Sequence, residues 1–566
     1  MKGALILGIA NFIVKIIGAV FKIPLYELIG KDGSGLFNVA YQIYTFMFII
    51  ATAGFPTAVS KMVAESSARG NERESRKIFE AAALLLGTIG IIGAAALYIF
   101  SDNLAALLGN RDAAFCIKVI APTIFFTSIV SAYRGFFQGK QNMYPTAASE
   151  VIESVAKLGV GILLAIFFTG MAIDPALDKM VDFASHTVKS SADRTILSAS
   201  GAIMGVTSGA VMSLILMAVV YSVSKRKNRT LIQNTAVRSK GAILKELVAI
   251  AIPITIGASV SSLTSLVDLA TVMNRLVVNP KVFDNYAHLF APGTAFAKEA
   301  ATLGWSGLEL LEKKANTLYG MYTGQAQTMF NLPLTIVVAL SMSAVPAISA
   351  AIAKRSESEA AGITGSLIKI TVLFALPCAV GLCVLSEGIL GLLYSDADAF
   401  MLLQKLAIAI IFVSVVQVTN AVLQSYGKVY YPVISMIIGG IAKVFMNYTF
   451  IPVLGIDGAP IATIVCYGII SLLNIIFVMR VVKIRFSIMD FVIKPLFAAA
   501  VMGGVLMLLT DVLGNGRLVT VLSIAAGGAA YIICAFLVRA ISREDVLILP
   551  KGEKLAAIFE RFKLLK

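Results

Sequence analysis

Hydrophobic residues occur in long blocks that are separated by short polar or charged segments. A helix of about twenty apolar residues spans the hydrocarbon core of a bilayer and satisfies its own backbone hydrogen bonds there. The pattern therefore predicts an all-α integral membrane protein with about fourteen transmembrane helices. The blocks lie near 4–28, 36–60, 78–100, 115–137, 146–169, 197–222, 243–277, 318–353, 363–386, 402–426, 430–453, 457–480, 488–510 and 518–540.

The loops between the blocks alternate in charge, and this alternation predicts the orientation of the chain. Basic residues gather at 61–77, at 225–240 and in the tail from Arg539, whereas acidic residues mark 102–112 and 174–182. The positive-inside rule makes the basic side cytoplasmic and predicts a plasma-membrane protein with both termini inside. The net charge of +15 is spread over these loops, with no basic domain for nucleic acid.

A set of landmarks recurs in the second half of the chain and predicts an internal repeat. Gly320 lies 290 positions after Gly30, and Lys443 lies 286 positions after Lys157. Because each copy would contain six helices, the two copies have the same orientation, as in transporters built from parallel repeats. The matched landmarks are Gly30 with Gly320, Gly35 with Gly324, Pro56 with Pro346, Gly139 with Gly427, Pro145 with Pro432 and Lys157 with Lys443.

The repeat divides the chain into two predicted lobes and an additional helix pair. An N-lobe of six helices and a C-lobe of six helices would enclose a central substrate path and alternate its access to the two sides. Helices 13 and 14 lie outside the repeat. The predicted boundaries are 1–225 for the N-lobe, 226–242 for a cytoplasmic basic linker, 243–485 for the C-lobe, 486–540 for helices 13 and 14, and 541–566 for a cytoplasmic tail.

The sequence contains no motif typical of an enzyme or of a metal site. It has no nucleophile elbow, no phosphate-binding loop and no paired metal ligands, and its five cysteines lie within or beside apolar blocks. We therefore expect a protein that is not an enzyme and has no resident cofactor, with coupling to Na⁺ or H⁺ left open.

Charged residues inside the predicted helices are the strongest functional signal. Each ion near the bilayer centre costs about 2.5–3.5 kcal/mol, so such residues usually face a cavity or a partner. Lys15 and Lys22 share one face of helix 1, and Arg275 ends helix 7. Glu153 and Lys157 stand one turn apart in helix 5 and are expected to pair with each other. The cations favour a basic cavity for an anionic headgroup such as pyrophosphate.

Asp268 is an acid among these cations, and its role has two interpretations. It neutralises Arg275 seven residues later, or it binds a coupling cation together with oxygens from Asn447 and Thr463.

The segment YRGFFQGKQNMYPTAASEVIESVAKL resembles the stage V sporulation protein B family of polysaccharide-type flippases. This family belongs with MurJ-type lipid II flippases to the superfamily of multidrug/oligosaccharidyl-lipid/polysaccharide exporters. GFPTAVSKMVAE and MFNLPLTIVVALSMSAVPAISAA are similar to its helix 2 and helix 8 signatures. The resemblance implies two six-helix lobes plus two helices, and movement of an undecaprenyl-linked peptidoglycan or polysaccharide precursor to the outer leaflet. It also implies a link to sporulation.

KIIGAVFK is similar to the helix 1 segment in which MurJ-type flippases carry two cavity arginines, which implies that role for Lys15 and Lys22. The expected partners are a lipid-linked oligosaccharide, the bilayer and cell-wall synthases. Two alternatives stay open at this point. One is a cation-coupled multidrug exporter of the same superfamily, and the other is a membrane scaffold for cell-wall assembly that transports nothing.

Overall fold

The computed structural model describes residues 2–170, 191–227, 238–482, 487–514 and 516–541. These ranges contain helices and no strand, which confirms the predicted all-α class. The segments outside the described residues include 171–190 between the apolar blocks 146–169 and 197–222, 228–237 of the predicted linker, and 542–566 of the predicted tail.

The chain divides into two compact units, Met1–Gly324 and Gln325–Lys566. The helices of unit 1 are α1 (Lys2–Thr52), α2 (Phe55–Ala68), α3 (Glu72–Ile99), α4 (Ser101–Leu107), α5 (Ala113–Gly139), α6 (Tyr144–Gly170), α8 (Ser191–Lys227), α9 (Lys240–Leu276), η2 (Pro280–Tyr286), α10 (Ala287–Phe290), α11 (Ala295–Leu303) and α12 (Gly307–Met321). The lobe boundaries inferred from the repeat stay a prediction.

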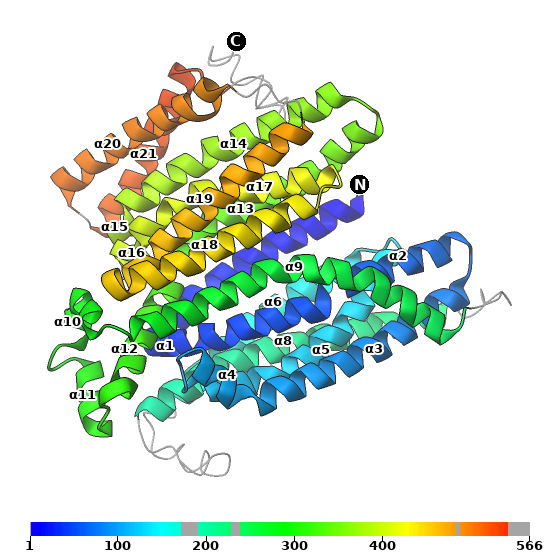
Figure 1. The fold of residues 1–566 in the computed structure, drawn as a ribbon, viewed down its shortest axis with the longest axis horizontal. Helices are drawn as coiled ribbons and strands as arrows, with labels where there is room; N and C mark the ends of the chain where they lie inside the picture. Colours follow the sequence, from blue (N-terminus) through cyan, green and yellow to red (C-terminus); the bar gives the residue numbers. More distant parts are fainter. Residues whose placement is uncertain (1, 171–190, 228–237, 483–486, 515, 542–566) are drawn as a thin grey trace. The chain divides into compact units, whose positions relative to one another are not determined.

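Small residues bring α6 and α8 of unit 1 into close contact. A Cβ added to Gly205 on α8 would lie 2.4 Å from the Gly161 Cα on α6, and one added to Gly209 would lie 2.6 Å from the Glu153 carbonyl oxygen. Close approach through small residues is the usual packing mode of membrane helices, because apolar side chains gain little by leaving lipid. Both α5 and α1 pack against this pair (Figure 1). The polar side chains of these helices are thereby held close together.

Helix α1 has 51 residues, longer than one span, and is interrupted at Gly30. Gly30 has φ 68°, a left-handed value that glycine adopts without a steric penalty. The sequence had predicted separate helices at 4–28 and 36–60, and the structure instead continues α1 across this break and ends it at Thr52. The second predicted helix is thus divided between α1 and α2.

Helix α12 packs on α1 beside this interruption. A Cβ added to Gly320 would lie 1.8 Å from the Lys31 carbonyl oxygen, and one added to Gly35 would lie 2.3 Å from the Asn316 side-chain oxygen. Two of the repeat landmarks, Gly35 and Gly320, therefore allow the two helices to touch.

Unit 2 follows a π-helical turn at Tyr322–Ala326. Its helices are α13 (Gln327–Ala353), α14 (Glu357–Val384), α15 (Ser386–Leu393), α16 (Phe400–Ala407), α17 (Ala409–Ser425), α18 (Tyr430–Leu454), η4 (Gly455–Asp457), α19 (Gly458–Val481), a π-helical turn η5 (Met489–Ile493), α20 (Lys494–Leu513) and α21 (Arg517–Leu537). One apolar cluster joins α14, α20 and α21, and another joins α13, α14, α17 and α19. The predicted helices 13 and 14 are therefore present as α20 and α21.

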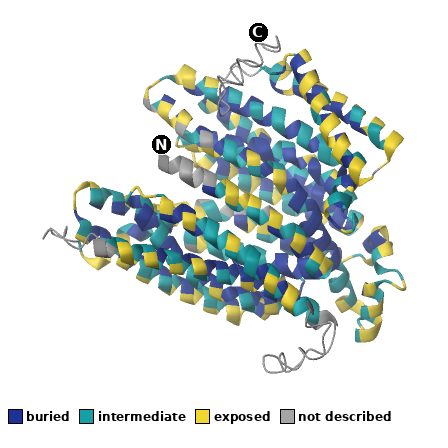
Figure 2. Ribbon diagram, turned by 180° about the vertical axis from the view of Figure 1, so that it is seen from behind, coloured by how far each residue is buried: buried dark blue, intermediate teal, exposed yellow. Residues whose placement is uncertain are grey.

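Within the described ranges, nine helical segments are long and apolar enough to cross a membrane, or ten if α16 and α17, which meet at 45°, form one broken span. One segment, Tyr430–Val481, is 52 residues long and contains both α18 and α19. Buried and exposed residues alternate along single helices, so most helices have one face against protein (Figure 2). The chain is a multi-pass membrane protein, while the count of fourteen stays a prediction.

Candidate functional site in unit 1

An ion pair between Arg134 on α5 and Glu153 on α6 is the centre of the polar cluster in unit 1. The Arg134 Nη2 donates to the Glu153 Oε2 at 2.8 Å, and the two side chains are only 14% and 24% exposed. Arg134 also donates from Nε to the Ser149 Oγ at 3.0 Å and from Nη2 to the Ser213 Oγ at 3.4 Å. Charge-assisted bonds of this kind fix both side chains in position.

This ion pair corrects one prediction and identifies a residue that the sequence analysis missed. Glu153 pairs with Arg134 and not with Lys157, because α5 packs beside the start of α6. Arg134 lies inside the predicted span 115–137, and an arginine within an apolar block was a sufficient signal for it.

Lys157 lies one turn further along α6 and is held by aromatic side chains of α1. Its Nζ lies 4.2 Å from the Tyr41 ring centroid and 5.4 Å from the Phe21 ring centroid, and it donates to the Tyr41 hydroxyl at 3.1 Å. Lys157 follows the start of α6 by thirteen residues, which places it about 20 Å along the helix. The ammonium group is thus stabilised by ring faces at membrane depth.

Lys22 on α1 brings a second cation to the same place. Lys22 and Lys157 are close enough for their ammonium groups to repel each other. Helices α1 and α6 pack together, so this proximity is built into the unit. Two like charges in a low-dielectric setting attract an anion, particularly one with more than one negative charge.

The other predicted binding residues have different surroundings. Lys15 lies two turns before Lys22 on α1 and is exposed, while Arg275 is the last but one residue of α9 and is half-buried. All five predicted substrate-binding residues therefore belong to unit 1, and Lys22, Glu153 and Lys157 lie in its polar cluster.

The three predicted cation-binding residues fall in both units. Asp268 is half-buried on α9 in unit 1 and acts electrostatically on Tyr319 of α12. Asn447 and Thr463 are buried on α18 and α19 in unit 2, where the Thr463 hydroxyl donates to the Ala459 carbonyl at 2.9 Å. A joint cation site for these residues stays a prediction.

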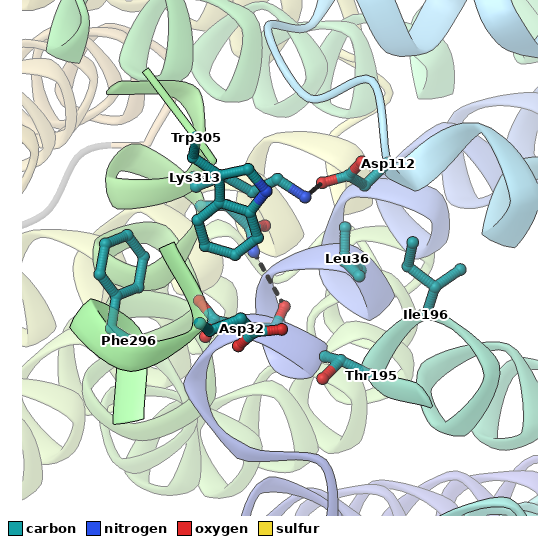
Figure 3. A pocket seen from close by; sticks show the side chains of 10 residues that line it. Asp32, Leu36, Asp112, Thr195, Ile196, Phe296, Trp305 and Lys313 are labelled. Carbon is teal, nitrogen blue, oxygen red and sulfur yellow. Dashed lines mark hydrogen bonds and ion pairs between the residues drawn. The ribbon is translucent and has the colours of Figure 1, made fainter. Parts of the chain in front are cut away.

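A second polar region lies where α12 meets the interrupted part of α1 (Figure 3). Asn316 donates to the Asp32 carbonyl oxygen at 3.0 Å and accepts from Asn110 at 2.6 Å, while Thr317 donates to the Asp32 carboxylate. Lys313 pairs with Asp112 and lies 4.6 Å from the Trp305 ring centroid. These contacts surround a cavity of about 30 Å³, large enough for a water molecule.

The Asp32 carboxyl in this region is electrostatically perturbed. Burial raises its pKa to about 6, against the opposing hydrogen bond from Thr317, and the nearby Glu299 adds to the rise. Asp32 lies between the first two predicted spans, in the part of unit 1 that the charge pattern places outside the membrane.

The residues after α9 form short helices with an aromatic core. Phe290 packs against Phe283 and Phe296, and Phe296 packs against Trp305 with ring centroids 5.7 Å apart. The segment 278–317, between the apolar blocks 243–277 and 318–353, contains η2, α10, α11 and the start of α12. It is therefore built from short helices and not from one continuous helix.

Two family models match the chain. The model described as polysaccharide biosynthesis protein matches residues 1–181, and the model of lipid II flippase MurJ matches residues 318–545. The two matches cover parts of both units.

Three curated proteins of Bacillus subtilis (strain 168) are similar over nearly the whole length. The uncharacterized membrane protein YabM is 26% identical, covering 99% of this chain and 96% of the relative. Lipid II flippase MurJ is 25% identical with 95% of each chain covered, and stage V sporulation protein B is 23% identical with 97% of each covered. The resemblance to the flippase family is thus confirmed.

Solved structures show the same fold. The structure of lipid II flippase MurJ in an inward closed conformation has a TM-score of 0.66 at 14% identity, covering 94% of this chain and 98% of its own. An inward-facing multidrug resistance MATE family transporter of the MOP superfamily has a TM-score of 0.60 at 14% identity, covering 84% of this chain and 98% of its own. The fold is that of MOP-superfamily transporters, and the sequence matches support a membrane flippase or transporter.

Proposed function

We propose that the protein is a flippase that moves an undecaprenyl-linked cell-wall precursor from the inner to the outer leaflet. The observation that carries this proposal is the approach of Lys22 and Lys157 at membrane depth, on two helices that pack together. An isoprenyl diphosphate headgroup has at least two negative charges, which would relieve the repulsion between the ammonium groups. A lipid II-like peptidoglycan precursor or a related polysaccharide unit has this chemistry.

The basic residues are assigned distinct roles in this proposal. Lys22 and Lys157 bind the diphosphate, and Arg134 holds Glu153 so that this carboxylate does not occupy Lys157. Lys15 and Arg275 are proposed to attract the headgroup along the path, because exposed cations raise the local concentration of anions. Alternating access of the two predicted lobes would then carry the headgroup across, with the isoprenyl chain remaining in lipid.

A cation-coupled multidrug exporter is the second candidate, because a MATE family transporter shares the fold. The cluster in unit 1 argues against it. Lys22 and Lys157 would repel a cationic drug, and Glu153 is already paired with Arg134.

Reconstitution into proteoliposomes tests both candidates. Lipid II, another undecaprenyl-diphosphate sugar and an organic cation are each offered to the same preparation, and movement across the bilayer is measured for each. The proposal expects movement of at least one lipid-linked diphosphate and none of the organic cation. Export of the cation without movement of any lipid-linked sugar would favour the exporter, and no movement of any of them would favour a scaffold.

A further inference from the structure

Glu150 on α6 is a half-buried acid that the proposed binding site does not use. It precedes Glu153 by three residues, so the two carboxylates lie on the same side of the helix. Its Oε2 is buried and has no hydrogen-bond donor among the described residues. A buried carboxylate oxygen that lacks a donor favours the neutral, protonated form of the group.

The hydrogen bonds of Arg134 explain why Glu150 has no donor. Arg134 gives its Nη2 to Glu153 and Ser213 and its Nε to Ser149. Glu150 lies within electrostatic range of Arg134 and of Glu153, so it is attracted by one and repelled by the other. Two carboxylates thus share one guanidinium, and Glu153 has the hydrogen bond.

The helices packed against α6 bring few other charges to Glu150. From α5 comes Arg134, together with Tyr133 near the same end of that helix. From α1 come Tyr41, Tyr44 and Lys22, of which only Lys22 carries a cationic side chain. From α8 comes Ser213. The charged residues of α8 lie at its two ends, and the part between them, residues 195–224, has Tyr221 as its one titratable side chain.

We propose that Glu150 is a proton-binding site whose occupancy is linked to anion binding at Lys22 and Lys157. The Glu150 carboxylate takes a proton from water and forms an O–H bond, and on release the proton returns to water. The proton adds one positive charge to the group formed by Lys22, Lys157, Arg134, Glu153 and Glu150. This extra charge strengthens anion binding.

The reverse effect follows from thermodynamic linkage. If a proton on Glu150 raises the affinity for an anion, the bound anion raises the affinity for the proton by the same factor. The headgroup would then be carried with part of its charge compensated by a proton. This coupling rests on the proposed function, whereas proton binding by Glu150 alone does not.

Infrared difference spectroscopy of the full chain in nanodiscs measures the proton directly. The carbonyl band of protonated carboxylic acids is followed from acidic to neutral pH for the wild type, for Glu150→Gln and for Glu65→Gln. Glu65 is the matched control, because it is exposed and pairs with Arg69 at 3.7 Å on α2. Asp32 contributes to this band up to a pH of about 6 in every variant. We expect a further component that persists to neutral pH in the wild type and Glu65→Gln and that is missing from Glu150→Gln. An unchanged band in Glu150→Gln would overturn the proposal.

Glu153→Gln provides a second readout with a different expected result. Without the Glu153 carboxylate, Arg134 is free to pair with Glu150, so the Glu150 band should disappear at a pH lower by about one unit or more, a tenfold loss of proton affinity. An unchanged midpoint would contradict the shared guanidinium.

Undecaprenyl diphosphate added to the same nanodiscs tests the link to anion binding. The wild type should take up protons on binding, and Glu150→Gln should bind with less proton uptake and without the rise in affinity at acidic pH. Binding without any difference in proton uptake would overturn the link while leaving the proposed flippase intact. Failure of the wild type to bind, with the Glu150 band present, would instead contradict the proposed function.

Discussion

The two units differ in what they bury between the helices that the predicted repeat matches. Aligned on Lys157 and Lys443, the two predicted copies match Glu153 with Gly439 and Glu150 with Met436. Aligned on Lys140 and Lys428, they match Arg134 with Val422. Helix α6 packs on α8 as α18 packs on α19, and α5 packs on α8 as α17 packs on α19. Unit 1 therefore places an ionic cluster where unit 2 has apolar residues and a glycine.

Unit 2 buries charge elsewhere, at Lys369 on α14 and at Asp457, which pairs with Lys405 at 2.8 Å. The contact between α17 and α19 uses neutral groups. The Asn474 side chain on α19 donates to the Asn420 side-chain oxygen at 2.7 Å and to the Thr419 hydroxyl at 3.1 Å on α17. These amide and hydroxyl groups are buried without the desolvation penalty of an ion. Because α17 and α19 pack through neutral groups in unit 2, the Arg134–Glu153 pair of unit 1 is better explained by function than by packing.

Removing one partner of the ion pair should have the largest effect on stability. Arg134→Ala leaves the Glu153 carboxylate buried and uncompensated, which costs about 3–5 kcal/mol in the free energy of unfolding. This loss is measured by denaturant unfolding of the protein in detergent. Arg69→Ala, which breaks an exposed pair, is the control and should cost less than about 1 kcal/mol. Equal losses in the two variants would show that the Arg134 pair is not buried as described.

A double variant removes the charges of unit 1 at these positions, where unit 2 has uncharged residues. Arg134→Met with Glu153→Gln removes both charges, so we expect it to recover most of the stability lost in Arg134→Ala. A double variant as unstable as the single one would mean that the ion pair itself is required for α5 and α6 to pack.

A methyl group added to α18 tests how closely α18 and α19 pack in unit 2. In Gly439→Ala, the new Cβ would lie 2.3 Å from the Cγ1 of Ile470, a buried side chain on α19. We expect a loss of about 1–3 kcal/mol in unfolding free energy from this overpacking. Gly468→Ala on α19 is the control, because its Cβ has no neighbour within 4 Å and should not destabilise the unit. A loss in Gly468→Ala as large as that in Gly439→Ala would exclude close packing as the cause.

The Asp32 carboxyl makes the stability of unit 1 depend on pH. Its folded pKa of about 6 lies above the ordinary value of 3.8, so the folded state holds a proton that the unfolded state releases. The resulting stability is present at acidic pH and is lost as the pH rises through about 4 to about 6. Because Asp32 is partly exposed, we expect a change of about 1–2 kcal/mol.

Asp32→Asn should remove this loss, since it has no charge to desolvate. The unfolding midpoint of the variant and the wild type is compared at acidic and neutral pH, with the exposed Asp102→Asn as control. An identical pH dependence in Asp32→Asn and wild type would show that Asp32 is not the responsible group.

The apolar blocks predicted the helices well, and the helix interruptions less well. Both α20 and α21 match their predicted blocks because each is a single apolar run that ends at polar residues. The break between α16 and α17 at Ile408 lies inside the predicted block 402–426 and carries no proline or glycine. The local pattern therefore contains no signal for this break.

The sequence identified individual charged residues inside the helices, but it did not identify their partners. Lys22 and Lys157 were predicted from the cost of an ion in the bilayer, a property of each residue alone. The pairing of Glu153 with Arg134, and the isolation of Glu150, depend on which helices pack together. Spacing along one helix favoured Lys157 as the partner of Glu153, whereas the guanidinium of the neighbouring helix makes the better bond.

Transport by a variant without the paired cations tests the central claim most directly. Lys22→Gln with Lys157→Gln removes both proposed diphosphate ligands, and Lys443→Gln on α18 removes the matched lysine of the second copy. Lipid II movement is measured in proteoliposomes with equal amounts of folded protein. We predict a loss of at least about tenfold in the double variant, which corresponds to about 1.4 kcal/mol, and a much smaller change in Lys443→Gln. Undiminished movement in the double variant would contradict the account.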